Sequence, residues 1–201
     1  MNQLPVPGRD TVYVWTGRAT GDQRELTRRL LRRAGGALLG RPEAGIGVDR
    51  RPGGRPEVRA DDGRTLPVSV SHVDGVVVVA ARAAGPVGVD VERRRPLPAT
   101  SLARRWYAPD EADWLAARDE TGRELDFLRL WTAKEAVGKA LGRGLRGGGL
   151  RRRMPPPHGG GELWPVPGRP DARVGHPAGG DDLVLAVAVL GAAGPVGVVL
   201  A

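Results

Sequence analysis

The chain has 201 residues, a formal net charge of +8 and no cysteine. Its length suits one compact unit or two small halves around a buried core, and the missing cysteines exclude disulfides, thiolate catalysis and zinc–thiolate sites. The charge fits either a solvated arginine-rich surface or a polyanionic partner, such as a nucleic acid, a phosphorylated cofactor or an acidic protein.

The N-terminal region alternates apolar and arginine-rich segments. Residues 11–15, TVYVW, predict a strand, and residues 24–40, RELTRRLLRRAGGALLG, predict a basic helix. No basic region followed by an apolar run opens the chain, so we expect no signal peptide. The long apolar run at 183–201 is broken by Gly-Pro and predicts a strand pair rather than a membrane span. We therefore expect a soluble cytoplasmic protein with no membrane contact.

The segment AAGPVGV occurs twice, at 83–89 and 192–198, each time after an apolar strand. Strand, Gly-Pro turn and strand predict a β-hairpin in each copy. A basic helical segment lies upstream of each copy, at 24–40 and 127–142. The identity could be coincidence in a chain rich in Ala, Gly and Val, but the matching order of elements favours an internal duplication. Only the first copy continues into two carboxylates, as Asp90-Val91-Glu92.

Between the copies, two short helices are predicted near 99–107 and 110–118, the second begun by Pro-Asp-Glu. Residues 143–181 are rich in Gly, Pro and Arg. We expect mostly loop there, with one strand near the segment GELWPV.

The segment VGVDVE, residues 87–92, predicts a strand with valines on one face and Gly88, Asp90 and Glu92 on the other. Two carboxylates on one face lie about 6–7 Å apart at Cα, within reach of one small hard cation such as Mg²⁺. The alternative is a solvated strand face whose carboxylates pair with Arg93, Arg94 and Arg95.

The segment WTAKEAVGKALGRGL, residues 131–145, predicts an amphipathic helix and holds Lys134 and Lys139, the only lysines of the chain. Its buried stripe would comprise Leu130, Ala133, Val137, Ala140 and Leu141. Trp131, Glu135 and Lys139 form a second stripe at i, i+4 spacing, which an ordinary surface ion pair would also produce. Gly142 and Gly144 read as the helix stop, since this G-x-G-x-x-G match follows a helix instead of a strand.

A third segment, SVSH at 69–72, places Ser71 and His72 at the end of a strand. No cysteine and no G-x-S-x-G motif accompanies them, which argues against a hydrolase triad. A histidine that donates to a phosphate at a strand end is an open alternative to a structural one.

In chain order stand GRP (54–56), SVSH (69–72), GVDVE (88–92) and WTAKEAVGKALGRGL (131–145). This order resembles the 4′-phosphopantetheinyl transferases of the larger, Sfp-like type, with their G-K-P, S-H, G-[IV]-D-[IV]-E and W-x-x-K-E-x-x-x-K motifs and G-x-G-L tail. The resemblance covers residues 46–145 well. It implies an α+β fold of two similar α/β halves related by pseudo-two-fold symmetry, with coenzyme A bound between them. We place the halves at 1–93 and 94–201.

The resemblance implies transfer of the 4′-phosphopantetheine arm of coenzyme A to a serine of an apo carrier protein, with release of 3′,5′-ADP. Asp90, Glu92 and Glu135 would bind Mg²⁺, for which Mn²⁺ could substitute. The catalytic residues would be Asp90, Glu135 as the base for the serine, and Lys139 at the α-phosphate. Coenzyme A would also contact Ser71, His72 and Lys134, and the adenine would lie against Gly54, Arg55 and Pro56.

Two departures from the family pattern bear on coenzyme A. Arg55 stands where Lys is usual, and only residues 16–23 separate the first strand from the first helix, where the family has a further helix that grips the 3′-phosphate. We assign Arg24 and Arg28 to that contact instead.

The expected partner is an acidic apo acyl or peptidyl carrier protein of natural product biosynthesis. It would meet residues 93–118, chiefly Arg93, Arg94, Arg95, Arg104 and Arg105, with Leu102 and Trp106 as apolar anchors. We expect a monomer that binds no nucleic acid. The alternatives are a catalytically impaired relative that binds coenzyme A, and a basic nucleic-acid-binding module, which would leave Asp90, Glu92 and Glu135 unexplained.

Overall fold

The computed structural model describes residues 10–51, 54–158, 160–180, 182–192 and 194–201. Its helices are α1 (Gln23–Leu39), α2 (Ala99–Trp106), α3 (Pro109–Ala116) and α4 (Glu120–Ala140), with short 3₁₀ turns at Glu43–Gly45 and Gly149–Arg151. Its strands are β1 (Thr11–Arg18), β2 (Ile46–Arg50), β3 (Pro56–Ala60), β4 (Thr65–Leu66), β5 (Val68–Val73), β6 (Val76–Arg82), β7 (Val87–Arg93), β8 (Trp164–Val166), β9 (Arg169–Gly175), β10 (Leu183–Leu190) and β11 (Gly197–Leu200). The protein is a mixed α/β structure.

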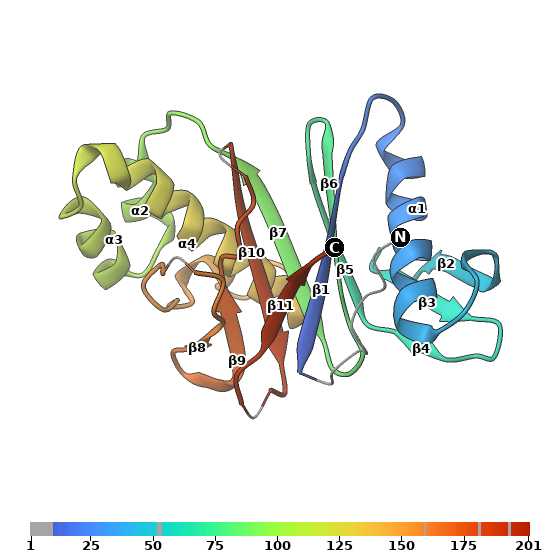
Figure 1. Ribbon diagram of the computed structural model, residues 1–201. Helices are drawn as coiled ribbons and strands as arrows, with labels where there is room; N and C mark the ends of the chain where they lie inside the picture. Colours follow the sequence, from blue (N-terminus) through green and yellow to red (C-terminus); the bar gives the residue numbers. More distant parts are fainter. Residues whose placement is uncertain (1–9, 52–53, 159, 181, 193) are drawn as a thin grey trace.

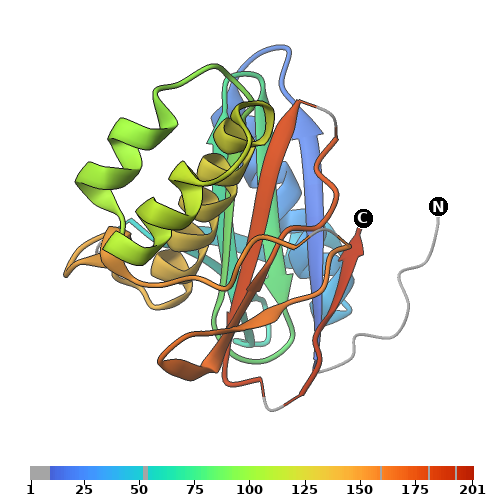
Figure 2. The same ribbon diagram turned by 90° about the vertical axis from the view of Figure 1, so that its left-hand side faces the viewer.

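The described strands form two four-stranded sheets and one small sheet. The first sheet has the order β11-β1-β6-β5, the second β7-β10-β9-β8, and the small sheet β2-β3-β4. The pairs are antiparallel except that β11 runs parallel to β1, as Figure 2 shows for the red C-terminal strand beside the blue N-terminal one. The first sheet therefore contains strands from both ends of the chain.

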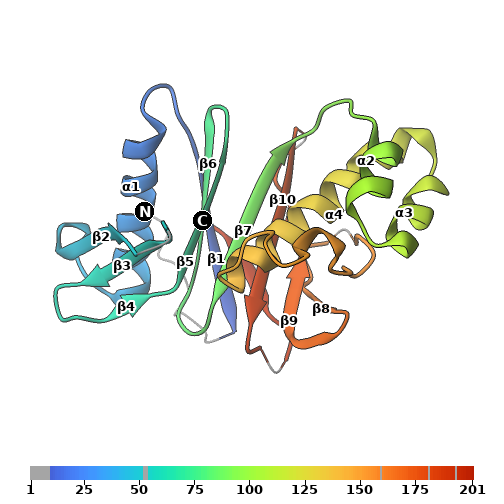
Figure 3. The ribbon, with the colours of Figure 1, turned by 180° about the vertical axis from the view of Figure 1, so that it is seen from behind.

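The two larger sheets pack face to face, and a helix covers the outer face of each (Figures 1 and 3). Valines and leucines of β1, β6, β7 and β10 fill the space between the sheets. Helix α1 buries Leu26, Leu30 and Leu31 against the opposite face of the first sheet, beginning at the Asp22 cap and ending at Gly40 with φ 64°.

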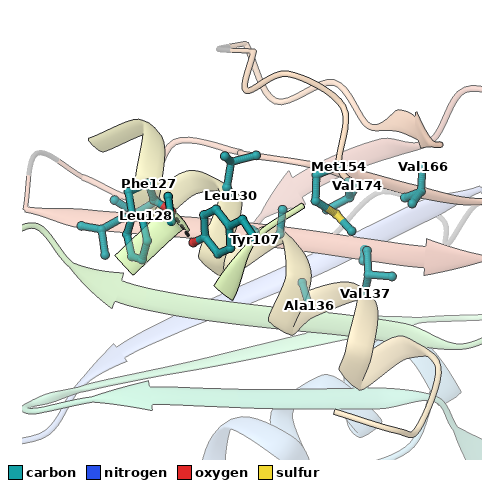
Figure 4. Packing of buried hydrophobic residues seen from close by; sticks show 14 of the residues in the cluster. Tyr107, Phe127, Leu128, Leu130, Ala136, Val137, Met154, Val166 and Val174 are labelled. Atoms are coloured by element: carbon teal, nitrogen blue, oxygen red, sulfur yellow. Dashed lines mark hydrogen bonds between the residues drawn. The ribbon is translucent and has the colours of Figure 1, made fainter. Parts of the chain in front are cut away.

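Helices α2, α3 and α4 cover the second sheet. Their shared core, drawn in Figure 4, contains Tyr107 stacked on Phe127, with the Tyr107 hydroxyl donating to the Phe127 carbonyl at 3.1 Å. Helix α4 lies across β7 and β10. This packing fixes one face of α4 toward the strand that carries Asp90 and Glu92.

The two predicted hairpins are wrong. Strand β6 pairs with β1 and β5, and β7 pairs with β10, so the Gly85-Pro86 corner carries the chain from one sheet to the other. The second copy likewise leads from β10 in the second sheet to β11 in the first, although residue 193 lies outside the described residues. Both edges of β6 and β10 already have partners, so the strand that follows stacks on the neighbouring sheet instead of pairing.

The predicted helices and the strand near GELWPV are confirmed, with shifts of a few residues except that α4 begins seven residues earlier than expected. Strand β9 lies in the segment expected to be loop, and the small sheet was not predicted. Helix α4 is the longest of the described helices, and none of them is both long and apolar enough to cross a membrane.

Candidate functional site

The candidate site lies where the edge strands of the two large sheets meet. Strands β5 and β7 stand at the ends of their sheets and contact each other. The backbone N–H of Val89 donates to Ser69 Oγ at 3.1 Å, and Ser71 Oγ donates to Asp90 Oδ1 at 2.8 Å. Two serine side chains of β5 therefore hydrogen-bond to a backbone group and to a side chain of β7. We call this contact line between β5 and β7 the seam.

Lys139 reaches the seam from α4. Its Nζ donates to Asp90 Oδ1 at 2.8 Å, to Ser71 Oγ at 2.9 Å and to the Val89 carbonyl at 3.0 Å. Burial raises the pKa of Asp90, and the Lys139 charge opposes that rise. Among the described residues, Asp90 Oδ2 is the one buried acceptor atom of a side chain without a hydrogen-bond partner. An orphaned carboxylate oxygen of this kind suits a cation.

Two glycines allow the close packing that brings these groups together. A Cβ on Gly88 of β7 would strike the carbonyl oxygen of Ala136 and lie 2.7 Å from the amide nitrogen of Ala140. A Cβ on Gly138 would strike the carbonyl oxygen of Gly144, which also has the left-handed φ of 55°. The glycines in GVDVE and in the GKALGRG tail thus set the separation of β7, α4 and the loop after it.

Glu135 lies one helical turn before Lys139 on the same face. Between Trp131 and Ala140, only Trp131, Glu135 and Lys139 are half-buried and the others are buried, as the predicted second stripe requires. Burial raises the pKa of Glu135, and the charges of Asp90 and Glu92 raise it further. The charges of Asp90 and Glu92 therefore influence the ionisation of Glu135.

A divalent cation would suit these oxygen ligands and the orphaned Asp90 Oδ2. Within the described part of the chain, however, no three His, Asp or Glu side chains converge closely enough to hold a metal ion. Asp90 Oδ1 is held by Lys139, and Glu92 Oε2 accepts from Arg95 Nη1 at 2.8 Å. The carboxylate oxygens suit a divalent cation, and two of the three carboxylates, Asp90 and Glu92, pair with a lysine and an arginine of the protein.

A cavity of about 1230 Å³ opens on the other face of β5, between α1 and the small sheet. His72, whose side chain alternates with that of Ser71 along β5, is exposed and lines it. Of the residues predicted to bind coenzyme A, this arginine-lined cavity also contains Arg24, Arg28, Gly54 and Pro56. Sequence reasoning missed Arg50, which lines the same cavity and donates to the Gly54 carbonyl at 2.8 Å.

Four predicted contacts of coenzyme A lie outside the cavity: Ser71 and Lys139 at the seam, and Arg55 and Lys134 away from it. Arg55 Nη2 donates to the Lys139 carbonyl at 2.9 Å, at the end of α4. Lys134 is fully buried, and its Nζ donates to Glu111 Oε2 and to the Arg152 carbonyl, each at 2.6 Å. Lys134 therefore points into the packing of α3 and α4, away from the seam. Trp131 packs between Trp106 and Phe127 rather than on a ligand surface.

Comparison with known proteins matches this chain to one family. Residues 86–158, which contain β7 and α4, match the family model of the 4′-phosphopantetheinyl transferase superfamily. A putative 4′-phosphopantetheinyl transferase of Synechocystis is 36% identical over 98 residues, which are 48% of this chain and 40% of that protein. The 4′-phosphopantetheinyl transferase HetI of Nostoc is 31% identical over 122 residues, 59% of this chain and 51% of the relative.

The 4′-phosphopantetheinyl transferase Sfp of Bacillus subtilis is 32% identical over 77 residues, 38% of this chain and 34% of that protein. The matches thus span about half or less of these relatives' lengths. The matched family region contains Asp90 and Lys139, which bond to each other at the seam, and also Glu92 and Glu135. Over residues 86–158, which hold β7 and α4, the chain resembles the 4′-phosphopantetheinyl transferase superfamily.

Proposed function

We propose that the protein transfers the 4′-phosphopantetheine arm of coenzyme A to a serine of an apo acyl or peptidyl carrier protein and releases 3′,5′-ADP. The observation that carries the proposal is the seam, where Lys139, Ser71 and the half-orphaned Asp90 bond to one another. On the same strand β5, His72 faces a cavity lined by Arg24, Arg28 and Arg50. A phosphate-rich substrate would find the three arginines in the cavity, beside Asp22, Asp49 and Asp74, and carboxylates at the seam.

The cavity would take the nucleotide end of coenzyme A. Its arginines would pair with phosphate oxygens, and Gly54 and Pro56 would lie against the base. Asp90, Glu92 and Glu135 would hold Mg²⁺ or Mn²⁺, which when bound would neutralise charge on the pyrophosphate. Lys139 would donate to the leaving phosphate, and Glu135 would accept the proton of the serine hydroxyl as its oxygen forms the new P–O bond and the bond to 3′,5′-ADP breaks.

The carrier protein would approach residues 93–118. On α2, Arg104 and Arg105 are exposed, and Leu102 and Trp106 are half-buried beside them. An acidic helix would complement such a surface, chiefly by raising the association rate. Reversal of both arginines to glutamate should raise the KM for the apo carrier and leave the KM for coenzyme A unchanged. An unchanged KM for the carrier would move its docking surface elsewhere.

We also propose the two-half organisation of the Sfp-like type, with halves at 1–93 and 94–201 related by pseudo-two-fold symmetry. Two observations support it. Strand β7 of the first half lies in the second sheet and β11 of the second half lies in the first. Helix α1 covers the outer face of the first sheet, and α2, α3 and α4 cover that of the second. We further propose a cytoplasmic monomer that serves natural product biosynthesis. Size-exclusion chromatography with light scattering would test the oligomeric state.

The decisive experiment measures the mass of an apo carrier protein after incubation with the enzyme, Mg²⁺ and coenzyme A. We expect the mass of one phosphopantetheine arm to be added to the carrier serine and 3′,5′-ADP to appear in equal amount. Glu135→Gln and Lys139→Ala should give no gain in the time that the wild type needs for completion. Glu120→Gln, an exposed carboxylate at the start of the same helix, is the matched control.

Coenzyme A binding without any mass gain would instead identify an impaired relative, and binding of neither coenzyme A nor carrier would end the proposal. Loss of activity on removal of divalent cations by a chelator, restored by Mg²⁺, would support the metal role of the three carboxylates.

A further inference from the structure

Residues 54–56 contact two places at once. Gly54 and Pro56 line the arginine-lined cavity, while the side chain of Arg55 between them reaches the end of α4. There its Nη2 donates to the backbone carbonyl of Lys139 at 2.9 Å. The same residue, Lys139, holds Asp90 through its side chain. One hydrogen bond therefore links the wall of the cavity to the residue that bridges the seam.

The end of α4 is suited to receive a guanidinium. The last carbonyls of a helix lack intrahelical donors and carry the negative end of the helix dipole. Gly142, with φ 72°, leaves room there, since a Cβ on it would lie 2.7 Å from Arg55 Nη1. The Lys139 carbonyl also accepts from the Gly142 N–H at 3.0 Å, so Arg55 adds a second donor to a carbonyl in the last turn.

We propose that Arg55 is a positioning residue: it holds the last turn of α4 so that Lys139 stays on Asp90, and it makes that hold sensitive to a nucleotide in the neighbouring cavity. Its guanidinium fork suits this role, because one nitrogen can donate to Lys139 while the other lies beside Gly142. The role in turnover rests on the function proposed for Lys139, whereas the effect on α4 does not.

The first test needs no activity. Hydrogen exchange of residues 141–144, whose amides bond to carbonyls of α4, is compared in the wild type and in Arg55→Ala. We expect several-fold faster exchange in the variant. Coenzyme A should slow exchange there in the wild type and have little effect in the variant. The matched control is Arg59→Ala, which removes an exposed arginine of the same small sheet that pairs with Glu57. Equal exchange in Arg55→Ala and the wild type would overturn the proposal.

The second test separates positioning from binding. Arg55→Ala should lower kcat roughly three- to tenfold, as loss of one exposed charged hydrogen bond allows, with the KM for coenzyme A nearly unchanged. Arg55→Lys, which keeps the charge and one donor nitrogen but not the fork, should recover part of the loss. A raised KM with unchanged kcat would show that Arg55 binds coenzyme A and would overturn the positioning role. If the wild type itself adds no mass to the carrier, the proposed function fails, and the exchange measurement alone decides the role of Arg55.

Discussion

Helix α4 carries both lysines of the chain, and each meets a carboxylate in a different way. Lys134 has no exposed surface, and its partner Glu111 is satisfied at both oxygens, by Lys134 at 2.6 Å and by the Met154 N–H at 2.9 Å. Lys139 retains 29% of its side-chain exposure, and its partner Asp90 keeps one buried oxygen without a donor. We call the Lys134–Glu111 pair closed, because both oxygens of its carboxylate accept a hydrogen bond, and the Lys139–Asp90 pair open, because Asp90 Oδ2 accepts none. The difference distinguishes a structural contact from a site where a carboxylate oxygen is left to bind a further group.

The closed pair gives the largest expected effect. Lys134→Met removes a cation that also lies 4.7 Å from the centre of the Tyr107 ring, and leaves the Glu111 carboxylate buried without its partner. We expect a loss of about 3–5 kcal/mol in the free energy of unfolding, measured with urea. The double variant with Glu111→Gln keeps an acceptor for Met154 and should recover much of that loss. A single variant as stable as the wild type would contradict the closed pair.

For the open pair, Lys139–Asp90, we expect a large loss of activity and a small loss of stability. Lys139→Met is expected to lower kcat by about 10²–10³, the size of effect seen when one donor to developing charge is removed. Its cost in stability should be smaller than that of Lys134→Met, because Lys139 is partly solvated whereas Lys134 is fully buried. Steady-state kinetics and urea unfolding of both lysine variants, measured side by side, test the contrast.

Gly88→Ala perturbs the open pair without changing a charge. The new methyl would strike the Ala136 carbonyl and push β7 from α4, which separates Asp90 from Lys139. Overpacking of this kind costs about 1–3 kcal/mol, and activity should fall with stability. In the control, Gly47→Ala, the nearest heavy atom to the added Cβ is 3.6 Å away. Stability equal to that of the control would contradict the close approach.

Local periodicity predicted the parts of the site that depend on it. The 3.6-residue repeat separated Trp131, Glu135 and Lys139 from the buried face, and strand alternation placed Asp90 opposite the valines of β7. The same repeat puts Lys134 about 100° from Glu135 around the helix. The assignment of Lys134 to coenzyme A therefore rested on the resemblance to the family motif and not on periodicity.

Pairing between distant segments was beyond sequence reasoning. Whether β6 pairs with β7 or stacks on it depends on β1, β5 and β10, which lie far away in the chain. Strand β9 was missed because its polar outer residues conceal Ala172 and Val174, which are buried under α4. Arg50 was missed because nothing in its local sequence distinguishes it from the other exposed arginines, and only the fold brings it to the cavity.

A third contact on α4 gives the smallest effect and extends the comparison to pH. His176 Nε2 donates to the Arg129 carbonyl at 2.9 Å, and burial lowers its pKa to about 4 from the ordinary 6.5. The Arg129 charge lowers this pKa further, while the bond to the carbonyl and the Asp126 charge oppose the change. Like Lys134, His176 donates to a backbone carbonyl. The lowered pKa of His176 means that its surroundings favour the neutral imidazole.

Between pH 6.5 and 4, the unfolded chain therefore binds a proton at this histidine that the folded protein does not, so stability falls as the pH falls. From pH 7 to pH 5 we expect the wild type to lose about 1–2 kcal/mol more than His176→Gln, whose amide can donate to the same carbonyl. Carboxylates that titrate in this range are common to both proteins and cancel in the difference. Urea unfolding at the two pH values measures it, and equal losses would show that His176 is free to take up a proton in the folded protein.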